Sequence, residues 1–187
     1  MRRRYWPLLA LIFPLLGAPT ADFVSVRRKL DLIESDQLKP GARVNLTSRE
    51  LNAYLVNSLT DYVPQGVRDA RLELGDGSAS GSALIDFLKL RQATGNPPGW
   101  IMSRLLSGER PVRVTAQVQS GAGLATVNVQ RVEISGVAID GKMLDYLIDT
   151  FVIPQFPDAK VGKPFELAHR IDRLEVKPTA VGVVVGK

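Results

Sequence analysis

The sequence contains no cysteine, and His169 is its only histidine. The lack of cysteine excludes disulfides, thiolate zinc sites, thiol catalysis and haem attachment through cysteine. A single histidine excludes metal sites built from several imidazoles. Apolar residues make up 45 % of the 187 positions, which is ordinary for a globular domain long enough to bury its own core.

Motifs of common enzyme classes are also missing. Segment 77–81 has Ala79 where the serine of a G-x-S-x-G elbow would stand, and neither a P-loop nor a dinucleotide fingerprint is present. Asp145 and Asp149 are one helical turn apart on what we expect to be a solvated face. We therefore expect no enzyme activity, no metal and no cofactor; an enzyme using His169 or the two aspartates is a third-ranked alternative.

The N-terminal segment has the order of residues found in secretory signals. Arginines occupy positions 2–4, an apolar run follows over 6–16, and small residues close the segment. The run is too short for a spanning helix. We predict a signal peptide over residues 1–21, cleaved after Ala21 or the threonine before it, and one exported, periplasmic or cell-envelope domain over 22–187. A retained N-terminal anchor is the alternative.

The charge balance argues against a nucleic-acid partner. Residues 22–187 carry 21 basic and 19 acidic side chains, because three of the 24 arginines and lysines lie in the predicted signal. The basic residues at 27–29 are also interspersed with acids rather than gathered in a stripe.

Helical spacing of apolar residues begins at Phe23 and predicts an amphipathic helix that continues until Pro40. After a short extended segment, 43–46, Thr47 and Glu50 form a T-x-x-E capping box, which predicts the start of a second amphipathic helix.

Two extended runs, 67–74 and 78–90, meet at an Asp-Gly pair and predict a hairpin. The second run carries almost no side-chain bulk over 79–83. Small residues there permit sharp bending or close approach of another element, and a frayed hairpin tip is the alternative.

A second hairpin is expected over 112–119 and 124–134, with a bulge near residues 130–131 where the apolar parity changes. A third is expected over 171–177 and 180–186. Hairpins separated by single helices predict an α+β fold with an antiparallel sheet of about six strands, its helices on one side.

Two apolar segments invite a functional interpretation. Trp100, Ile101 and Met102 follow a proline-rich loop and would form a tip that contacts a membrane or a partner protein; a core-capping helix is the alternative. A helix capped by Asp140 carries an apolar stripe that continues through Phe151 into a loop. These apolar residues would form the rim of a cavity; packing over the end of the sheet is the alternative.

Segments 44–55 (VNLTSRELNAYL) and 139–144 (IDGKML) resemble exported bacterial domains of the LmeA-like phospholipid-binding family and, more distantly, tubular lipid-binding domains. The resemblance implies a strongly curved antiparallel sheet wrapped around amphipathic helices, with acyl chains held between them.

We therefore expect a non-enzymatic domain that binds or transfers lipid or another apolar ligand. The alternative is an assembly module of the cell envelope that binds a protein and no small ligand. The predicted ligand-lining residues come from the second helix and from the helix after Asp140: Leu51, Tyr54, Leu55, Leu59, Met143, Leu147 and Phe151.

Overall fold

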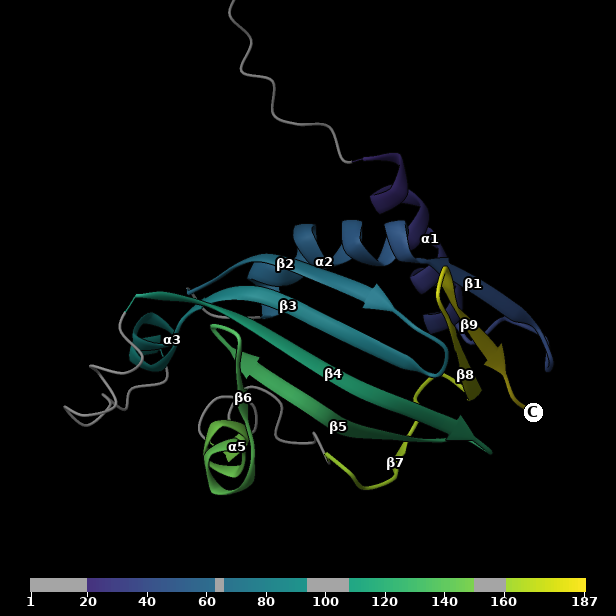
Figure 1. The fold of residues 1–187 in the computed structure, drawn as a ribbon. Coiled ribbons are helices and arrows are strands. Elements are labelled where there is room, and N and C mark those ends of the chain that lie inside the picture. Colours follow the sequence, from purple (N-terminus) through teal and green to yellow (C-terminus); the bar gives the residue numbers. More distant parts are fainter. Residues whose placement is uncertain (1–19, 63–65, 94–107, 150–160) are drawn as a thin grey trace, which may run out of the picture.

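The computed structural model describes residues 20–62, 66–93, 108–149 and 161–187, and the side chains of 59–62 and 91–93 fall outside this description. Within these ranges the chain forms four helices and nine strands, and every strand pairing is antiparallel (Figure 1). The predicted α+β class with an antiparallel sheet of about six strands is confirmed. A separate three-stranded sheet was not predicted.

The large sheet has the strand order β2-β3-β4-β5-β6, with β7 also paired to β5. The predicted bulge is confirmed: Thr115 pairs with Arg131 and Ala116 with Val129, so that Gln130 is the extra residue. The strands of this sheet are β2 (Val67–Leu74), β3 (Ser78–Asp86), β4 (Glu109–Gly121), β5 (Leu124–Ile134), β6 (Val137–Ile139) and β7 (Phe165–Glu166).

The small sheet has the order β1-β9-β8 and consists of β1 (Arg43–Thr47), β9 (Ala180–Val185) and β8 (Ile171–Lys177). Strand β8 lies across one end of the large sheet (Figure 1). The backbone N–H of Gly77, in the β2–β3 turn, donates to the Val176 carbonyl at 3.0 Å. At the end of β4, the Ser120 hydroxyl accepts a hydrogen bond from the Leu174 N–H at 2.7 Å.

Helices α1 (Ala21–Glu34) and α2 (Ser48–Tyr62) pack against each other beside the small sheet. The Thr20 hydroxyl caps α1 by accepting from the Phe23 N–H at 3.3 Å, so cleavage at either predicted signal position would remove this cap. The helix ends earlier than the expected limit at Pro40, because Asp36 adopts a left-handed φ of 54°. The buried cluster beneath α1 consists of Val26, Ile33, Val44, Leu46 and Val183.

Glu50 links α1, β1 and α2. The predicted capping box is confirmed: the Glu50 carboxylate accepts from the Thr47 N–H at 2.8 Å, and the Glu50 N–H donates to the Thr47 hydroxyl at 3.2 Å. The same carboxylate is buried and also accepts from the Ser25 hydroxyl at 2.6 Å and lies 2.7 Å from the Lys29 ammonium. Burial raises the pKa of Glu50, but the hydrogen bonds from Lys29, Ser25 and Thr47 outweigh it and lower that pKa to about 2.

The strand expected over 78–90 is wrong beyond Asp86. The Asp86 carboxylate accepts from the backbone N–H groups of Leu88 and Lys89, each at 3.1 Å, and starts helix α3 (Phe87–Ala93). Helix α5 (Gly141–Leu147) begins after Asp140 as expected, but the Asp140 side chain makes no capping hydrogen bond. None of the helices in the described ranges is long and apolar enough to cross a membrane.

Candidate functional site

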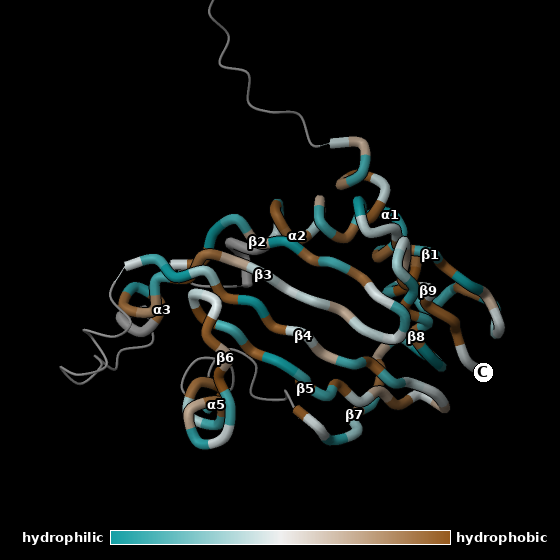
Figure 2. Tube along the Cα trace, viewed as in Figure 1, coloured by the Kyte–Doolittle hydropathy of each residue, from teal (hydrophilic) through white to brown (hydrophobic). Residues whose placement is uncertain are grey.

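One face of the large sheet is lined by apolar side chains over most of its area. In register, Leu72 lies beside Gly81, which lies beside Val114, which in turn lies beside Val132. Alternation along each strand then places every second residue on this side. Figure 2 shows hydrophobic and hydrophilic positions following one another along the strands of this sheet. We call this surface the apolar face, and it comprises Leu72, Leu74, Ala79, Gly81, Ala83, Ile85, Val112, Val114, Ala116, Val118, Ala125, Val127, Val129, Val132 and Ile134.

The bulge at Gln130 keeps β5 in phase with its neighbours. Without an extra residue, strict alternation would put Val129 and Val132 on opposite faces. Because Gln130 stands opposite no single partner, Val129 lies beside Ala116 and Val132 beside Val114, both on the apolar face.

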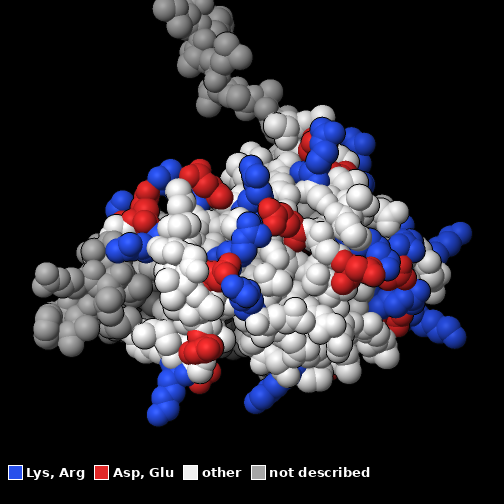
Figure 3. Space-filling view, in the orientation of Figure 1, with Lys and Arg blue, Asp and Glu red and all other residues white. Residues whose placement is uncertain are grey.

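The opposite face is polar. Arg113 pairs with Glu73 at 2.8 Å, and the hydroxyls of Ser80 and Thr115 are hydrogen-bonded at 2.9 Å. Figure 3 shows acidic and basic side chains interspersed rather than separated by sign. An open groove of about 380 Å³ lies on this side, lined by residues that include Asp69, Ser82, Arg113 and Glu133. Its charged residues are already paired with one another or with neighbours, which leaves the groove without a clear ligand chemistry.

The apolar face is incompletely covered. Only Ala125 and Val132 of its residues are buried, and all the others are partly exposed to solvent. The small sheet is packed differently, because Val44, Leu46 and Val183 belong to the buried cluster beneath α1. The two sheets thus differ: the small sheet contributes to a buried core, and the large sheet keeps most of its apolar side chains partly exposed to solvent.

Gly81 marks the open centre of this face. A Cβ atom placed on Gly81 would meet no atom of the described residues within 4 Å, its chain neighbours aside. Ala79 and Ala83 are the next residues of β3 on the same face, so this face carries only very small side chains in the middle of the strand. Contrary to one expectation, no other element within the described ranges comes within 4 Å of the Cβ position at Gly81. Pairing with both β2 and β4 also rules out a frayed tip.

Two of the four predicted lining residues of α2 lie against the buried cluster beneath α1. Leu51 and Tyr54 pack against the buried cluster, and the Tyr54 ring stacks on Phe23 with a centroid separation of 6.4 Å. Leu55 is partly buried, and the side chain of Leu59 lies outside the described residues.

The predicted lining residues of α5 are elsewhere. Met143 is 45 % exposed and Leu147 is buried. Helix α2 packs along β2, whereas α5 directly follows β6 at the opposite edge of the sheet (Figure 1). The strand order therefore separates the two apolar stripes. Phe151, Trp100, Ile101 and Met102 lie outside the described residues.

The acidic residues and histidine considered for chemistry are all exposed. Asp145 and Asp149 are solvent-facing, and His169 Nδ1 lies 3.9 Å from Asp36. In the part of the chain that the structure describes, no three acidic or histidine side chains gather as metal ligands would.

No known protein family matches this chain, and no curated protein matches its sequence. The apolar face was not among the predicted site residues. Two sequence signals identify it in retrospect: the valines of β5 that remain in phase only across a bulge, and the run of small residues in β3.

Proposed function

We propose that this protein binds a lipid or another apolar ligand on the apolar face of β2–β5 and catalyses no reaction. The observation that carries this proposal is the partial exposure of that face around the open position at Gly81. Apolar surface left in contact with water is unfavourable, and each ligand CH₂ group buried against it contributes about 0.8 kcal/mol.

The dimensions of the face support a hydrocarbon chain. From Val112 to Val118, β4 extends for about 20 Å at the usual rise of a strand. Half of a bilayer's hydrocarbon core is about 15 Å thick, which is the span of one layer of acyl chains. One chain therefore fits along β4 without leaving the apolar face.

Curvature of the sheet around the ligand is part of the proposal. The register shifts between Arg68 and Arg71 in β2 and at Gln130 in β5 are irregularities of the kind that increase local twist and bend a strand. The resemblance of segments 44–55 and 139–144 to LmeA-like domains supports the same arrangement, and the signal-like residues 1–21 support an exported, periplasmic location.

Lipid extraction of the purified protein followed by mass spectrometry, together with titration of a fluorescent fatty acid, tests the proposal. Gly81→Leu would fill the open position and is expected to lower probe affinity at least tenfold. Ser82→Leu adds the same side chain at the next residue, on the polar face, and is expected to leave probe binding unchanged. Failure of the unaltered protein to bind or co-purify with any lipid would reject the proposal, and a stable protein complex disrupted by Gly81→Leu would favour the assembly-module alternative.

A further inference from the structure

Arg110 is a cation at one end of the apolar face. It lies beside Ile85 in the β3–β4 register and two residues before Val112, so its side chain leaves the sheet on the apolar side. Its Nε atom is buried and has no hydrogen-bond partner among the residues that the structure describes. Such a donor is unusual, because nearly all buried polar groups in folded proteins are satisfied.

The acids nearest to Arg110 in the β3–β4 register are already engaged. Glu109 pairs with Arg68, whose Nε donates to it at 2.6 Å, and as the residue next to Arg110 it lies on the opposite face of β4. The carboxylate of Asp86 caps α3 and lies 3.5 Å from the Lys89 ammonium. Among the described residues, no acid is within ion-pair distance of Arg110.

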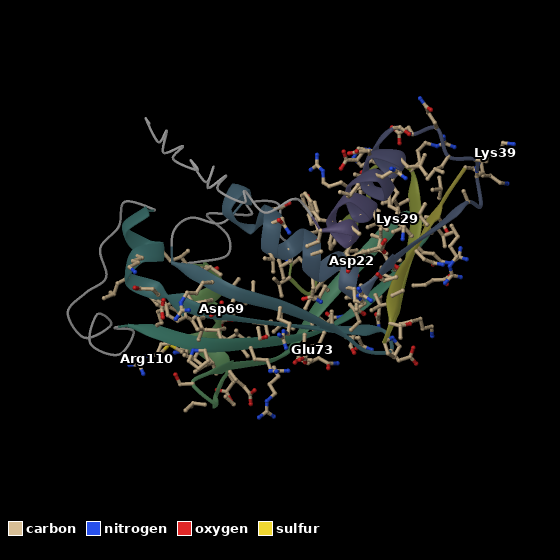
Figure 4. The ribbon with its side chains drawn as sticks, turned by 90° about the horizontal axis from the view of Figure 1, so that it is seen from above. Asp22, Lys29, Lys39, Asp69, Glu73 and Arg110 are labelled. Carbon is tan, nitrogen blue, oxygen red and sulfur yellow. The ribbon has the colours of Figure 1, made fainter. Side chains whose placement is uncertain are left out.

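The two ends of β4 differ. Strand β8 crosses the end that carries Ser120, where the Leu174 N–H donates to the serine hydroxyl at 2.7 Å. Arg110 stands at the other end, far from the small sheet, as its position relative to Lys39 in Figure 4 shows. A ligand with one polar end would therefore meet a cation at the Arg110 end and a crossing strand at the other.

We infer that Arg110 binds the carboxylate or phosphate headgroup of an anionic amphiphile whose hydrocarbon chain lies on the apolar face. This inference rests on the proposed function, and it adds the charge and the orientation of the ligand. A guanidinium group presents a planar fork of donors that matches either anion with two hydrogen bonds. Arg110 lies about 7 Å beyond Val112 along the strand, so a headgroup there leaves the stretch of β4 from Val112 to Val118 to the chain.

Isothermal titration with three ligands of equal chain length tests the inference: hexadecanoate, hexadecyl phosphate and uncharged hexadecanol. The unaltered protein is expected to bind either anion at least tenfold more tightly than the alcohol. Arg110→Gln is expected to abolish this preference while retaining alcohol binding, and Arg110→Lys to restore part of it. Arg113→Gln is the matched control, because it removes a cation from the polar face of the same strand.

The outcomes separate the two proposals. Equal affinity for anions and alcohol in the unaltered protein, or a preference that survives Arg110→Gln, would reject the inference but leave lipid binding intact. No binding of any of the three ligands would reject the proposed function as well. Inorganic phosphate that binds as tightly as hexadecyl phosphate would show a site for free anions and would also overturn the inference.

Discussion

The side-chain amide of Asn52 makes hydrogen bonds with both backbone groups of Leu72. Its Nδ2 donates to the Leu72 carbonyl at 2.8 Å, and its Oδ1 accepts from the Leu72 N–H at 2.8 Å. These are the two bonds that a neighbouring strand would supply. Because β2 is an edge strand of the large sheet, Asn52 both fastens α2 along that edge and occupies backbone groups that another chain would otherwise pair with.

Replacing Asn52 with aspartate tests this role. A carboxylate has the same size but cannot donate to the Leu72 carbonyl, so we expect a loss of about 1 to 3 kcal/mol in the free energy of unfolding. Asn57→Asp is the control, because Asn57 is exposed on the same helix and donates only to the Ala53 carbonyl. Urea denaturation measures both variants, and equal losses would contradict a special role for Asn52.

Helix capping by Asp86 gives a second prediction. Its carboxylate accepts two backbone N–H bonds at the start of α3, so Asp86→Ala is expected to lower the unfolding free energy by about 1 kcal/mol. Asp140 occupies the corresponding position before α5 but makes no capping bond, so Asp140→Ala is expected to change stability little. Thermal unfolding compares the two, and a larger effect of Asp140→Ala would contradict this difference in capping.

Local signals were sufficient for several elements. The Thr47–Glu50 capping box needs only neighbouring residues, and it was predicted correctly. The change of apolar parity in β5 likewise located the bulge at Gln130. By contrast, the apolar run that ends β3 is compatible with either a strand or a helix, and only the capping bonds of Asp86 settle where the strand ends.

The pairing of strands that are far apart along the chain could not be predicted from the sequence. Strand β1 pairs with β9, so that Arg43 lies beside Val184, and no local pattern predicts a partner so far along the chain. The same holds for the site: Leu51 and Met143 both lie on amphipathic helices, but strand order places those helices at opposite edges of the sheet. The bonds that Glu50 accepts from Ser25 and Lys29 also depend on how α1 packs.

Glu50 makes the free energy of unfolding depend on pH. Its folded-state pKa of about 2 lies below the ordinary value of 4.5, so as pH falls the unfolded chain takes up the proton first. The resulting stability, about 3 kcal/mol, is fully present above pH 4.5 and is lost as pH falls to about 2. Glu50→Gln is expected to lower stability at neutral pH and to flatten the dependence between pH 4.5 and 2. Urea denaturation across that range provides the measurement, with exposed Glu34→Gln as the control.

Deletion of Gln130 tests whether the bulge is needed for ligand binding or only for the phase of β5. Without it, β5 would pair with β4 as a regular ladder in which Val129 and Val132 keep their partners Ala116 and Val114, so we expect the protein to fold with nearly unchanged stability. Deletion of Asn128 would instead shift Val127 toward the polar face, with a loss of about 1.5 to 3 kcal/mol for the displaced valine. If curvature from the bulge shapes the apolar face, the Gln130 deletion lowers fatty-acid affinity while urea denaturation shows an intact fold; unchanged affinity would mean that the bulge only maintains the phase of β5.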